Sequence, residues 1–169
     1  KPSASQRRIL RINRDVQISQ KPPLATREQF ELFSKYQEFR HAGGDMSTMN
    51  FSDYQALIEE TLVDTFILEY RILGVLVGAC VVDQMGDGLS AVYSFFDPVK
   101  KSKSLGTYIV LRLILIAKQL SLPYVYLGYW VNGSQKMSYK EKFQPIEYYD
   151  GKGWIRGELI NSPRLVPEI

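Results

Sequence analysis

The spacing of apolar residues predicts two helices in the first third of the chain. Three aromatic residues at helical spacing predict a helix over 26–39, with Thr26 as its N-cap residue. The pair Gly43-Gly44 ends it, and a second helix is predicted from Ser52. Just before them, residues 16–18 alternate like a short strand. This part of the chain is therefore predicted as strand–helix–helix.

The period then changes from helical spacing to two-residue alternation. In 65–72, apolar residues share one face, while Glu69 and Arg71 share the other, which is typical of a strand. Apolar runs over 75–82 and 89–96 predict two further strands. Because the links between these strands are short, we expect an antiparallel meander.

The last third alternates between helix and strand. A helix over 104–120 is apolar almost all round, so we expect it to be buried against the sheet. The later predicted elements are a strand over 124–130, a helix over 134–143 and short strands over 147–149 and 154–156. The order β-α-α-β-β-β-α-β-α-β-β resembles the acetyltransferase-like (GNAT) fold. The expected class is α/β (α+β), with a mixed, mostly antiparallel sheet flanked by helices.

Length and composition fit one globular domain with an additional arm. The 169 residues are 45% hydrophobic and 23% charged, which excludes a wholly disordered chain. Lys21-Pro22-Pro23 is a local break, so we predict a basic arm with the first strand over 1–23 and a GNAT-like domain over 24–169. Since the sequence begins with Lys rather than Met, we expect a piece of a longer protein or a processed form.

Neither a membrane span nor a disulfide is indicated. The longest apolar stretch, 105–120, is interrupted by Arg112 and Lys118, and no secretory signal is recognisable. Cys80 is the only cysteine, so no internal disulfide can form, and its apolar surroundings predict a buried small side chain. Low cysteine use suits a reducing compartment, so we expect a cytoplasmic protein.

Net charge is only +3, yet the cations are clustered. The clusters are Lys1, Arg7, Arg8, Arg11, Arg14 and Lys21, with the single acid Asp15; then Lys100, Lys101 and Lys103; then Lys136, Lys140 and Lys142. Any one cluster is also explained as a solvated surface. Clustered cations can hold phosphates, however, and three clusters on one small chain favour a polyanionic partner.

The turn over 97–106 is the predicted reactive centre. GNAT proteins bind their acyl donor with a loop of pattern Gln/Arg-x-x-Gly-x-Gly/Ala, and the equivalent stretch here is 101–106. Gly106 matches the pattern, but Ser104 replaces the first glycine, so the donor need not be coenzyme A. The amides of Leu105 and Gly106 can hold a carbonyl or phosphate oxygen, or they simply start a helix.

Six strings are more specific than the fold. They are RHAGGDM (40–46), GLSAVYSFFDP (88–98), SLGTY (104–108), YVYLGYW (124–130), KMSYK (136–140) and FQPIE (143–147). Together they resemble the C-terminal catalytic part of the bacterial aspartate/glutamate leucyltransferases, which are relatives of the eukaryotic arginyl-tRNA–protein transferases. The resemblance covers roughly 5–154.

The resemblance implies transfer of leucine from leucyl-tRNA to the N-terminal amine of proteins beginning with Asp or Glu, which marks them for N-degron proteolysis. Leucyl-tRNA and such proteins are therefore the expected partners, and no oligomeric state is implied. The family also has an upstream module with a cysteine cluster, which these residues do not include. A metal or iron–sulfur site is expected, if anywhere, in that module, and no cofactor or metal site is expected in this chain.

Aminolysis of an activated ester needs little base, because an α-amine has a pKa near 8 and is partly neutral at pH 7. The protein has to align amine and ester, stabilise the oxyanion and protonate the leaving oxygen. Asp97 is the first catalytic candidate, and its alternative is a turn residue before Pro98. Tyr93, on the same face of the strand, can donate to an oxygen or is a core tyrosine.

The other candidates divide between donor and acceptor. Residues expected at the donor or tRNA 3′ end are Ser104, Leu105, Gly106, Tyr108, Tyr126, Tyr129, Lys101, Lys103, Lys136 and Lys140, with Tyr126 and Tyr129 stacking on a base. Residues expected to bind the acidic acceptor are Arg40, His41, Glu69 and Arg71. The tyrosines are also explained as core, Arg71 as a partner of Glu69, and Arg40 and His41 as helix-end residues.

Two other functions stay open on the sequence alone. One is a coenzyme A-dependent acetyltransferase of the GNAT fold, and the other is a non-catalytic tRNA- or peptide-binding module. Ser104 and the basic clusters favour aminoacyl transfer over acetyl transfer. The upstream module keeps the binding-module hypothesis open.

Overall fold

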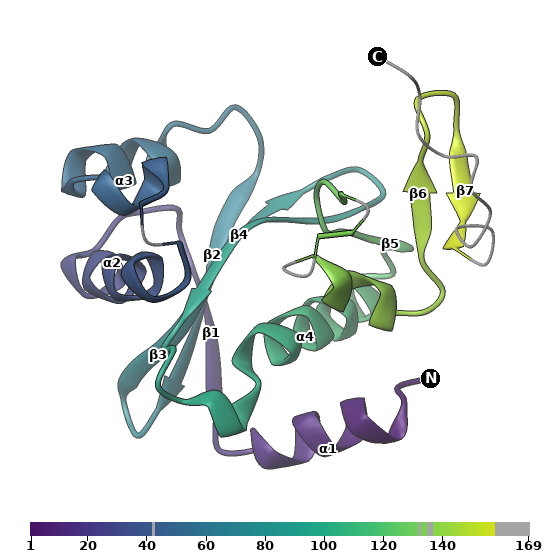
Figure 1. Ribbon diagram of the computed structural model, residues 1–169, viewed down its shortest axis with the longest axis horizontal. Coiled ribbons are helices and arrows are strands. Elements are labelled where there is room, and N and C mark those ends of the chain that lie inside the picture. Colours follow the sequence, from purple (N-terminus) through teal and green to yellow (C-terminus); the bar gives the residue numbers. More distant parts are fainter. Residues whose placement is uncertain (42, 132, 135–136, 158–169) are drawn as a thin grey trace. The chain divides into compact units, whose positions relative to one another are not determined.

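The structure is a computed structural model that describes residues 1–41, 43–131, 133–134 and 137–157 (Figure 1). The chain divides into two compact units, 1–128 and 129–169, which are described separately. This division falls after Gly128, whereas the boundary predicted between 23 and 24 stays a prediction.

The first unit is built on a five-stranded sheet of order β1-β2-β3-β4-β5. Its strands are β1 (Gln17–Lys21), β2 (Thr65–Ile72), β3 (Val75–Gln84), β4 (Gly88–Phe96) and β5 (Tyr124–Tyr126). Strands β1 to β4 pair antiparallel, and β5 pairs parallel to β4. The predicted meander and the mixed, mostly antiparallel sheet are thus confirmed, although the last strand ends four residues earlier than predicted.

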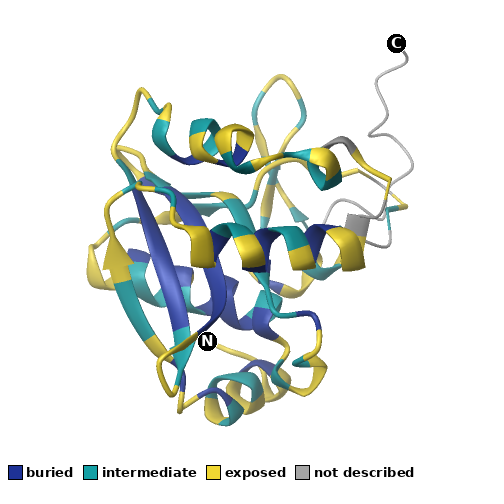
Figure 2. Ribbon diagram, turned by 90° about the vertical axis from the view of Figure 1, so that its left-hand side faces the viewer, coloured by how far each residue is buried: buried dark blue, intermediate teal, exposed yellow. Residues whose placement is uncertain are grey.

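Helices cover both faces of this sheet (Figure 1). They are α1 (Ala4–Ile12), α2 (Arg27–His41), α3 (Phe51–Glu59) and α4 (Leu105–Gln119), with short 3-10 turns η1 (Asp45–Thr48) and η2 (Lys101–Lys103). On one face, α2 and α3 pack against Ile67 and Phe95, while on the other α4 packs against Leu68 and Tyr70. Both faces of the central strands are therefore buried (Figure 2).

The basic arm contains a helix, α1, that the apolar spacing did not indicate. A capping box starts it: the Ser3 hydroxyl accepts from the Gln6 amide at 3.2 Å, and the Gln6 side chain accepts from the Ser3 amide at 2.8 Å. Ile9 and Leu10 pack against the cluster that contains α4. With so few apolar residues among arginines, the helix depends on this packing rather than on its own propensity.

Strand β4 carries a bulge at Val92. Val81 pairs with Tyr93 but the next residue, Val82, pairs with Ala91, so Val92 is an extra residue. Parallel pairing with β5 covers only 88–90 of β4. Beyond the bulge, that edge of β4 has no paired strand within the described residues. Bulges are common at sheet edges and beside active sites, so this edge is a candidate position for functional groups.

The second unit contains a short hairpin of β6 (Glu147–Tyr149) and β7 (Trp154–Arg156), as predicted. The rings of Trp130 and Tyr148 are in edge contact, with 4.9 Å between centroids. The predicted helix over 134–143 is shorter and of another type, since the 3-10 helix η3 covers Ser138–Lys142. Residues 135–136 lie outside the described part of the chain.

None of the described helices is long and apolar enough to cross a membrane.

Cys80 is fully buried in β3, as its apolar surroundings predicted. Burial raises the pKa of its thiol to about 12, so the nucleophilic thiolate is suppressed. Cys80 is therefore a core residue.

Candidate active site

Helix α4 starts in close contact with the end of β4. A Cβ atom at Gly106 would lie 2.9 Å from Cε1 of Phe96, so only glycine fits without displacing the ring. The Phe96 ring in turn packs against Tyr36 of α2, with 5.0 Å between centroids. Gly106 thus matches the donor-loop pattern, and the absence of a side chain at this position is also required by the close approach of Phe96.

The turn before α4 leaves backbone donors available. Ser104 has φ of 49°, in the left-handed region, and precedes the first residue of α4. Its carbonyl accepts from the Tyr108 amide at 3.0 Å, which is the first bond of the helix. The amides of Leu105 and Gly106 precede that bond, so they have no intrahelical acceptor, and the helix dipole favours a negative oxygen there. Their predicted role as donors to a carbonyl or phosphate stays a prediction.

Asp97 follows β4 and is held by two donors. Nζ of Lys35 lies 2.9 Å from its Oδ1, and the Val99 amide donates to the same oxygen at 3.1 Å. Partial burial raises the pKa of Asp97, but the hydrogen bonds from Lys35 and Val99 outweigh it, and the net pKa is below the ordinary value. A carboxylate with a lowered pKa is a weaker base, so this geometry favours the turn interpretation over a general base.

Tyr93 lies beside the bulge and faces α2. Nε2 of Gln37 donates to its hydroxyl, with 2.6 Å between the two atoms. Gln37 is 1% exposed, and Tyr93 is half-buried with its ring 6.0 Å from that of Phe33. Burial raises the pKa of Tyr93, and the hydrogen bond from Gln37 only partly opposes this, so the hydroxyl keeps its proton at neutral pH.

Tyr36 and Arg40, on the last turns of α2, form a second interacting pair next to Gln37 and Tyr93. Tyr36 is buried, and burial raises its pKa, while the charge and hydrogen bond of Arg40 act in the opposite direction. Tyr36 also acts electrostatically on Tyr93, so Arg40, Tyr36, Tyr93 and Gln37 form one cluster. The structure thus brings together a predicted catalytic residue, Tyr93, and a predicted acceptor-binding residue, Arg40.

Tyr36 and Gln37 are the members of this cluster that the sequence did not indicate as site residues. A signal was present, because Gln37 lies four residues after Phe33 and so shares the apolar face of the helix. A polar side chain on a buried face needs a partner, and here Tyr93 is that partner.

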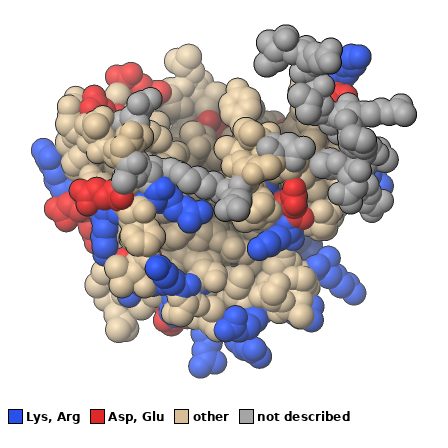
Figure 3. Space-filling model, in the orientation of Figure 1, with Lys and Arg blue, Asp and Glu red and all other residues tan. Residues whose placement is uncertain are grey.

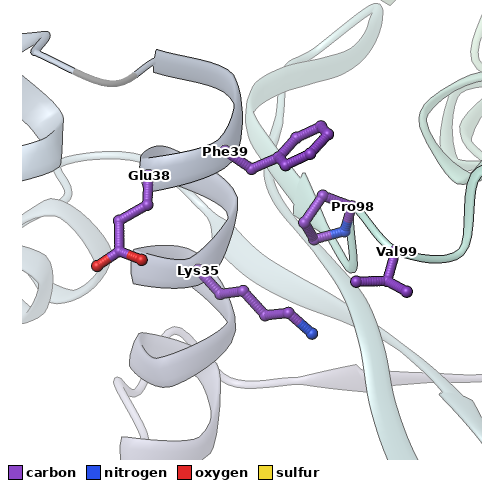
Figure 4. A pocket seen from close by; sticks show the side chains of 5 residues that line it. All are labelled: Lys35, Glu38, Phe39, Pro98 and Val99. Atoms are coloured by element: carbon purple, nitrogen blue, oxygen red, sulfur yellow. The ribbon is translucent and has the colours of Figure 1, made fainter.

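An open hollow of about 320 Å³ lies between the end of α2 and the turn after β4 (Figure 4). Its lining residues are Lys35, Glu38, Phe39, Pro98 and Val99. Lys35 and Phe39 extend toward Pro98 and Val99, whereas Glu38 points away (Figure 4). Phe39 is 58% exposed and Val99 73%, so the hollow offers an apolar surface beside the Lys35–Asp97 pair.

The lysines of the donor loop differ in what they do. Nζ of Lys101 lies 5.2 Å from the centre of the Phe39 ring, at the hollow. Nζ of Lys103 instead donates to the Asp15 carboxylate at 2.7 Å and to the Ile12 carbonyl at 2.9 Å. Lys103 therefore attaches α1 to the loop, which differs from its predicted role at the donor phosphates.

Glu69 and Arg71 lie on β2, where they contact the first turn of α2. Glu69 is 4% exposed and accepts from Gln29 at 2.9 Å and from Arg71 at 3.1 Å. Arg71 also makes two hydrogen bonds to Glu28, at 3.0 and 2.6 Å. The alternative interpretation of Arg71 as a partner of Glu69 is confirmed, and the network joins α2 to β2.

The tyrosines expected at the donor end are placed differently from one another. Tyr108 is 3% exposed and packs edge-on against Tyr70 in the core, so it presents no open face. The Tyr126 hydroxyl donates to Asp87 at 2.8 Å, and burial followed by this bond raises its pKa to about 12. Tyr108 thus agrees with the core alternative, while Tyr126 is half-buried and bound to the turn between β3 and β4.

In the second unit, Tyr129 is 92% exposed, so its ring is available for stacking. Lys140 is 8% exposed and donates to the Tyr129 carbonyl, and burial lowers the pKa of its ammonium. It therefore lies on no exposed helical face, contrary to the predicted phosphate-binding pair. Its predicted partner Lys136 lies outside the described residues, as does the side chain of His41.

Within the described part of the chain, no cluster of three or more His, Cys, Asp and Glu side chains could hold a metal ion.

Comparison with curated proteins extends over most of the chain. A protein called aspartate/glutamate leucyltransferase from Paramagnetospirillum magneticum is 52% identical over 156 residues, which are 92% of this chain and 64% of the relative. One of the same name from Gluconacetobacter diazotrophicus is 49% identical over 154 residues, 90% of this chain and 59% of the relative. The chain thus spans about three fifths of the length of these relatives.

Among solved structures, a possible acetyltransferase from Clostridium difficile 630 covers 75% of this chain and 88% of its own, with a TM-score of 0.53 and 13% identity. At that identity the likeness shows the fold alone, and it confirms the GNAT-like class. The family model described as arginine-tRNA-protein transferase, C terminus, matches residues 28–150, more than half of the chain. The chain therefore belongs to the family of arginine-tRNA–protein transferase C-terminal domains.

Proposed function

We propose that this protein transfers leucine from leucyl-tRNA to the N-terminal amine of proteins that begin with Asp or Glu. The main observation in support is 52% identity over 92% of the chain with a relative called aspartate/glutamate leucyltransferase. The product would carry an N-terminal leucine and enter N-degron proteolysis in the cytoplasm.

The ester end of the tRNA is proposed to lie at the start of α4. There the amides of Leu105 and Gly106 would donate to the leucyl carbonyl, whose oxygen gains negative charge as the amine attacks. The C–O bond to the ribose breaks as the new amide bond forms. The attacking amine loses one proton and the departing ribose oxygen gains one, so the protons balance by exchange with solvent.

Tyr93 is proposed to donate its hydroxyl proton as a hydrogen bond to a reacting oxygen. Since Gln37 already donates to the Tyr93 oxygen at 2.6 Å, the O–H of Tyr93 has to be directed to another acceptor. Gln37 therefore acts as a positioning residue. Asp97 is left as a turn residue that fixes the loop, because its carboxylate is engaged by Lys35.

The side chain of the acceptor's first residue is proposed to bind Arg40. Arg40 is exposed and lies in the same cluster as Tyr93, and its guanidinium can hold a carboxylate with two parallel hydrogen bonds. Its alternative role, as a cation at the C-terminal end of α2, does not exclude this one.

The test mixes the chain with charged leucyl-tRNA and peptides beginning with Asp, Glu, Arg or Lys, and follows the peptide mass. A leucine added to the acidic peptides alone is the expected result. Acetylation from acetyl-coenzyme A without transfer from tRNA would replace the proposal with a GNAT acetyltransferase. Binding of tRNA with no transfer would point to a non-catalytic module.

A further inference from the structure

Helix α1 has two opposite faces. Its buried face is formed by residues 6, 9, 10 and 13, at the spacing i, i+3, i+4 and i+7. Its exposed face carries Arg7, Arg8 and Arg11, and Arg14 continues it just past the helix end. The helix itself contains no acidic residue. Basic side chains are visible at the lower edge of Figure 3, where Figure 1 places α1.

This arrangement costs stability in the free protein. Like charges at i, i+3 and i, i+4 repel one another and destabilise a helix. The nearby acid, Asp15, offers little relief, because its carboxylate is bound by Lys103 at 2.7 and 2.8 Å. No ion pair forms at Arg8 or Arg11 within the described contacts, so a polyanionic partner would remove the repulsion.

The apolar face of α1 is already in use. Ile9 and Leu10 pack against the core, and the Asn13 side chain donates to the carbonyls of Ile9 at 2.9 Å and Lys103 at 2.7 Å. Helices that insert into a membrane interface need a free apolar face, so this packing disfavours a lipid partner. What α1 presents to solvent is cationic.

The same contacts connect α1 to the donor loop. Lys103, at the end of η2, donates to Ile12 and Asp15 at the C-terminal end of α1 and its continuation. Lys101 on the same turn reaches the Phe39 ring. The arginine face of α1 is therefore fixed beside the loop that precedes α4.

We propose that the exposed face of α1, with Arg8 and Arg11 at its centre, binds the phosphates of the tRNA acceptor stem. This inference rests on the proposed function, which requires an aminoacyl ester at the start of α4. Three residues of helix advance by about 4.5 Å, so Arg8 and Arg11 can contact neighbouring phosphates of one RNA strand. The stem would lie along α1, with its single-stranded 3′ end at the loop. The family model begins at residue 28, so the match does not include α1.

The test measures binding of an RNA hairpin that reproduces an acceptor stem with its 3′ CCA end, at several salt concentrations. Two arginine–phosphate contacts add about 1.4–1.8 to the slope of log K against log salt. The variant Arg8→Gln/Arg11→Gln should lose that part of the slope and bind about 20-fold more weakly at 0.15 M salt. Arg8→Lys/Arg11→Lys keeps the charge and should keep the slope.

The control is Lys21→Gln, which removes an exposed cation at the far end of β1 and should bind like the parent. Circular dichroism checks that each variant is folded. An unchanged affinity and slope in the Arg8→Gln/Arg11→Gln variant would overturn the inference, as would equal binding of anionic vesicles that the same change abolishes. Leucine transfer separates the two proposals: a parent that binds the hairpin through the arginines but transfers no leucine contradicts only the proposed function.

Discussion

The buried amide of Gln37 donates to the hydroxyl of Tyr93, with 2.6 Å between Nε2 and the phenolic oxygen. The pair joins α2 to β4 immediately after the bulge at Val92. Since the oxygen of Tyr93 is occupied as an acceptor from one side, the bond fixes the direction in which its own proton can be donated. The buried side chain of Gln37 thus sets the orientation of the Tyr93 hydroxyl as a donor.

Substituting Tyr93→Phe should lower kcat for leucine transfer by about 100-fold, because one preorganised donor to the transition state is lost. KM for the acceptor peptide should change little. The variant also leaves Nε2 of Gln37 with only the weak acceptor Sδ of Met46, which should cost about 1–3 kcal/mol of unfolding free energy. Transfer kinetics and urea unfolding measure the two effects separately.

Gln37→Leu tests whether the glutamine positions the tyrosine. It removes the donor but keeps the hydroxyl, so kcat should fall about 10-fold, less than in Tyr93→Phe. In the double variant the two losses should not add, because both act on the same hydroxyl. Tyr124→Phe on β5 is the matched control and should keep full activity; fully additive losses would show that Gln37 acts independently of Tyr93.

The position of α4 should depend on the absence of a side chain at Gly106. Gly106→Ala places a methyl group 2.9 Å from Cε1 of Phe96, and Phe96 is confined by Tyr36. We expect a loss of about 1–3 kcal/mol in unfolding free energy and a weaker affinity for the tRNA end.

The companion change Phe96→Leu should restore part of that stability by making room for the methyl group. Gly86→Ala is the control, because a Cβ atom there meets no atom within 4 Å. If Gly106→Ala is as stable as the control, the close packing of α4 on β4 is not required.

The sequence predicted the β2–β3–β4 meander and α4 well, because alternation and an apolar helix are local signals. It did not predict α1, since Ile9 and Leu10 are too few to show a helical period without the core they pack against. Residues 127–130 continue the apolar pattern of β5, yet pairing with β4 stops at Ser90 because of the bulge. Such a break depends on a partner strand and leaves no local pattern.

For the site, the sequence indicated Tyr93 and Arg40 but could not tell that they share a cluster. Asp97 was a candidate base because it follows the third strand of the meander. The cation that binds it, Lys35, lies 62 residues away in the chain, so the sequence did not indicate this pair. Lys103 and Lys140 look like free cations in the sequence, and only the tertiary contacts with Asp15 and the Tyr129 carbonyl show otherwise. Only the pairing of Arg71 with Glu69, two residues apart on one strand, was foreseeable from the sequence, because the other partners are distant along the chain.

Arg71 should matter for stability rather than for acceptor recognition. Arg71→Met leaves the Glu69 carboxylate, 4% exposed, without its cation, and loss of one partner of a buried pair costs about 3–5 kcal/mol. Glu28→Gln changes the exposed partner of Arg71 and should lower the unfolding free energy by under about 1 kcal/mol. Thermal unfolding measures both. A raised KM for an Asp peptide in folded Arg71→Met would instead support acceptor binding.

The Lys35–Asp97 pair should contribute to stability in a defined pH range. The pKa of Asp97 is lowered in the folded state, so the unfolded chain binds more protons at acid pH. The contribution is therefore present above the unfolded value of about 3.9 and is lost as the pH falls through the lower folded value. Lys35→Met removes the side-chain donor, and its stability should rise less between pH 2 and 5 than that of the parent, as urea unfolding at each pH would show. Parallel curves for the two proteins would exclude this coupling.

Arg40 should determine the preference for an acidic first residue. The change Arg40→Gln replaces a charge-assisted hydrogen bond with a neutral one, so kcat/KM for a peptide beginning with Asp should fall about 10- to 100-fold. A peptide beginning with Asn has almost the same shape without the charge, and its poor transfer should change little. The ratio of kcat/KM for the two peptides therefore separates recognition of charge from damage to catalysis.

Arg40→Lys should recover part of that ratio, because it keeps the charge but loses the planar pair of donors. An equal loss for both peptides would place Arg40 outside the acceptor site, and the exposed position at the end of α2 would then be explained by the helix dipole alone.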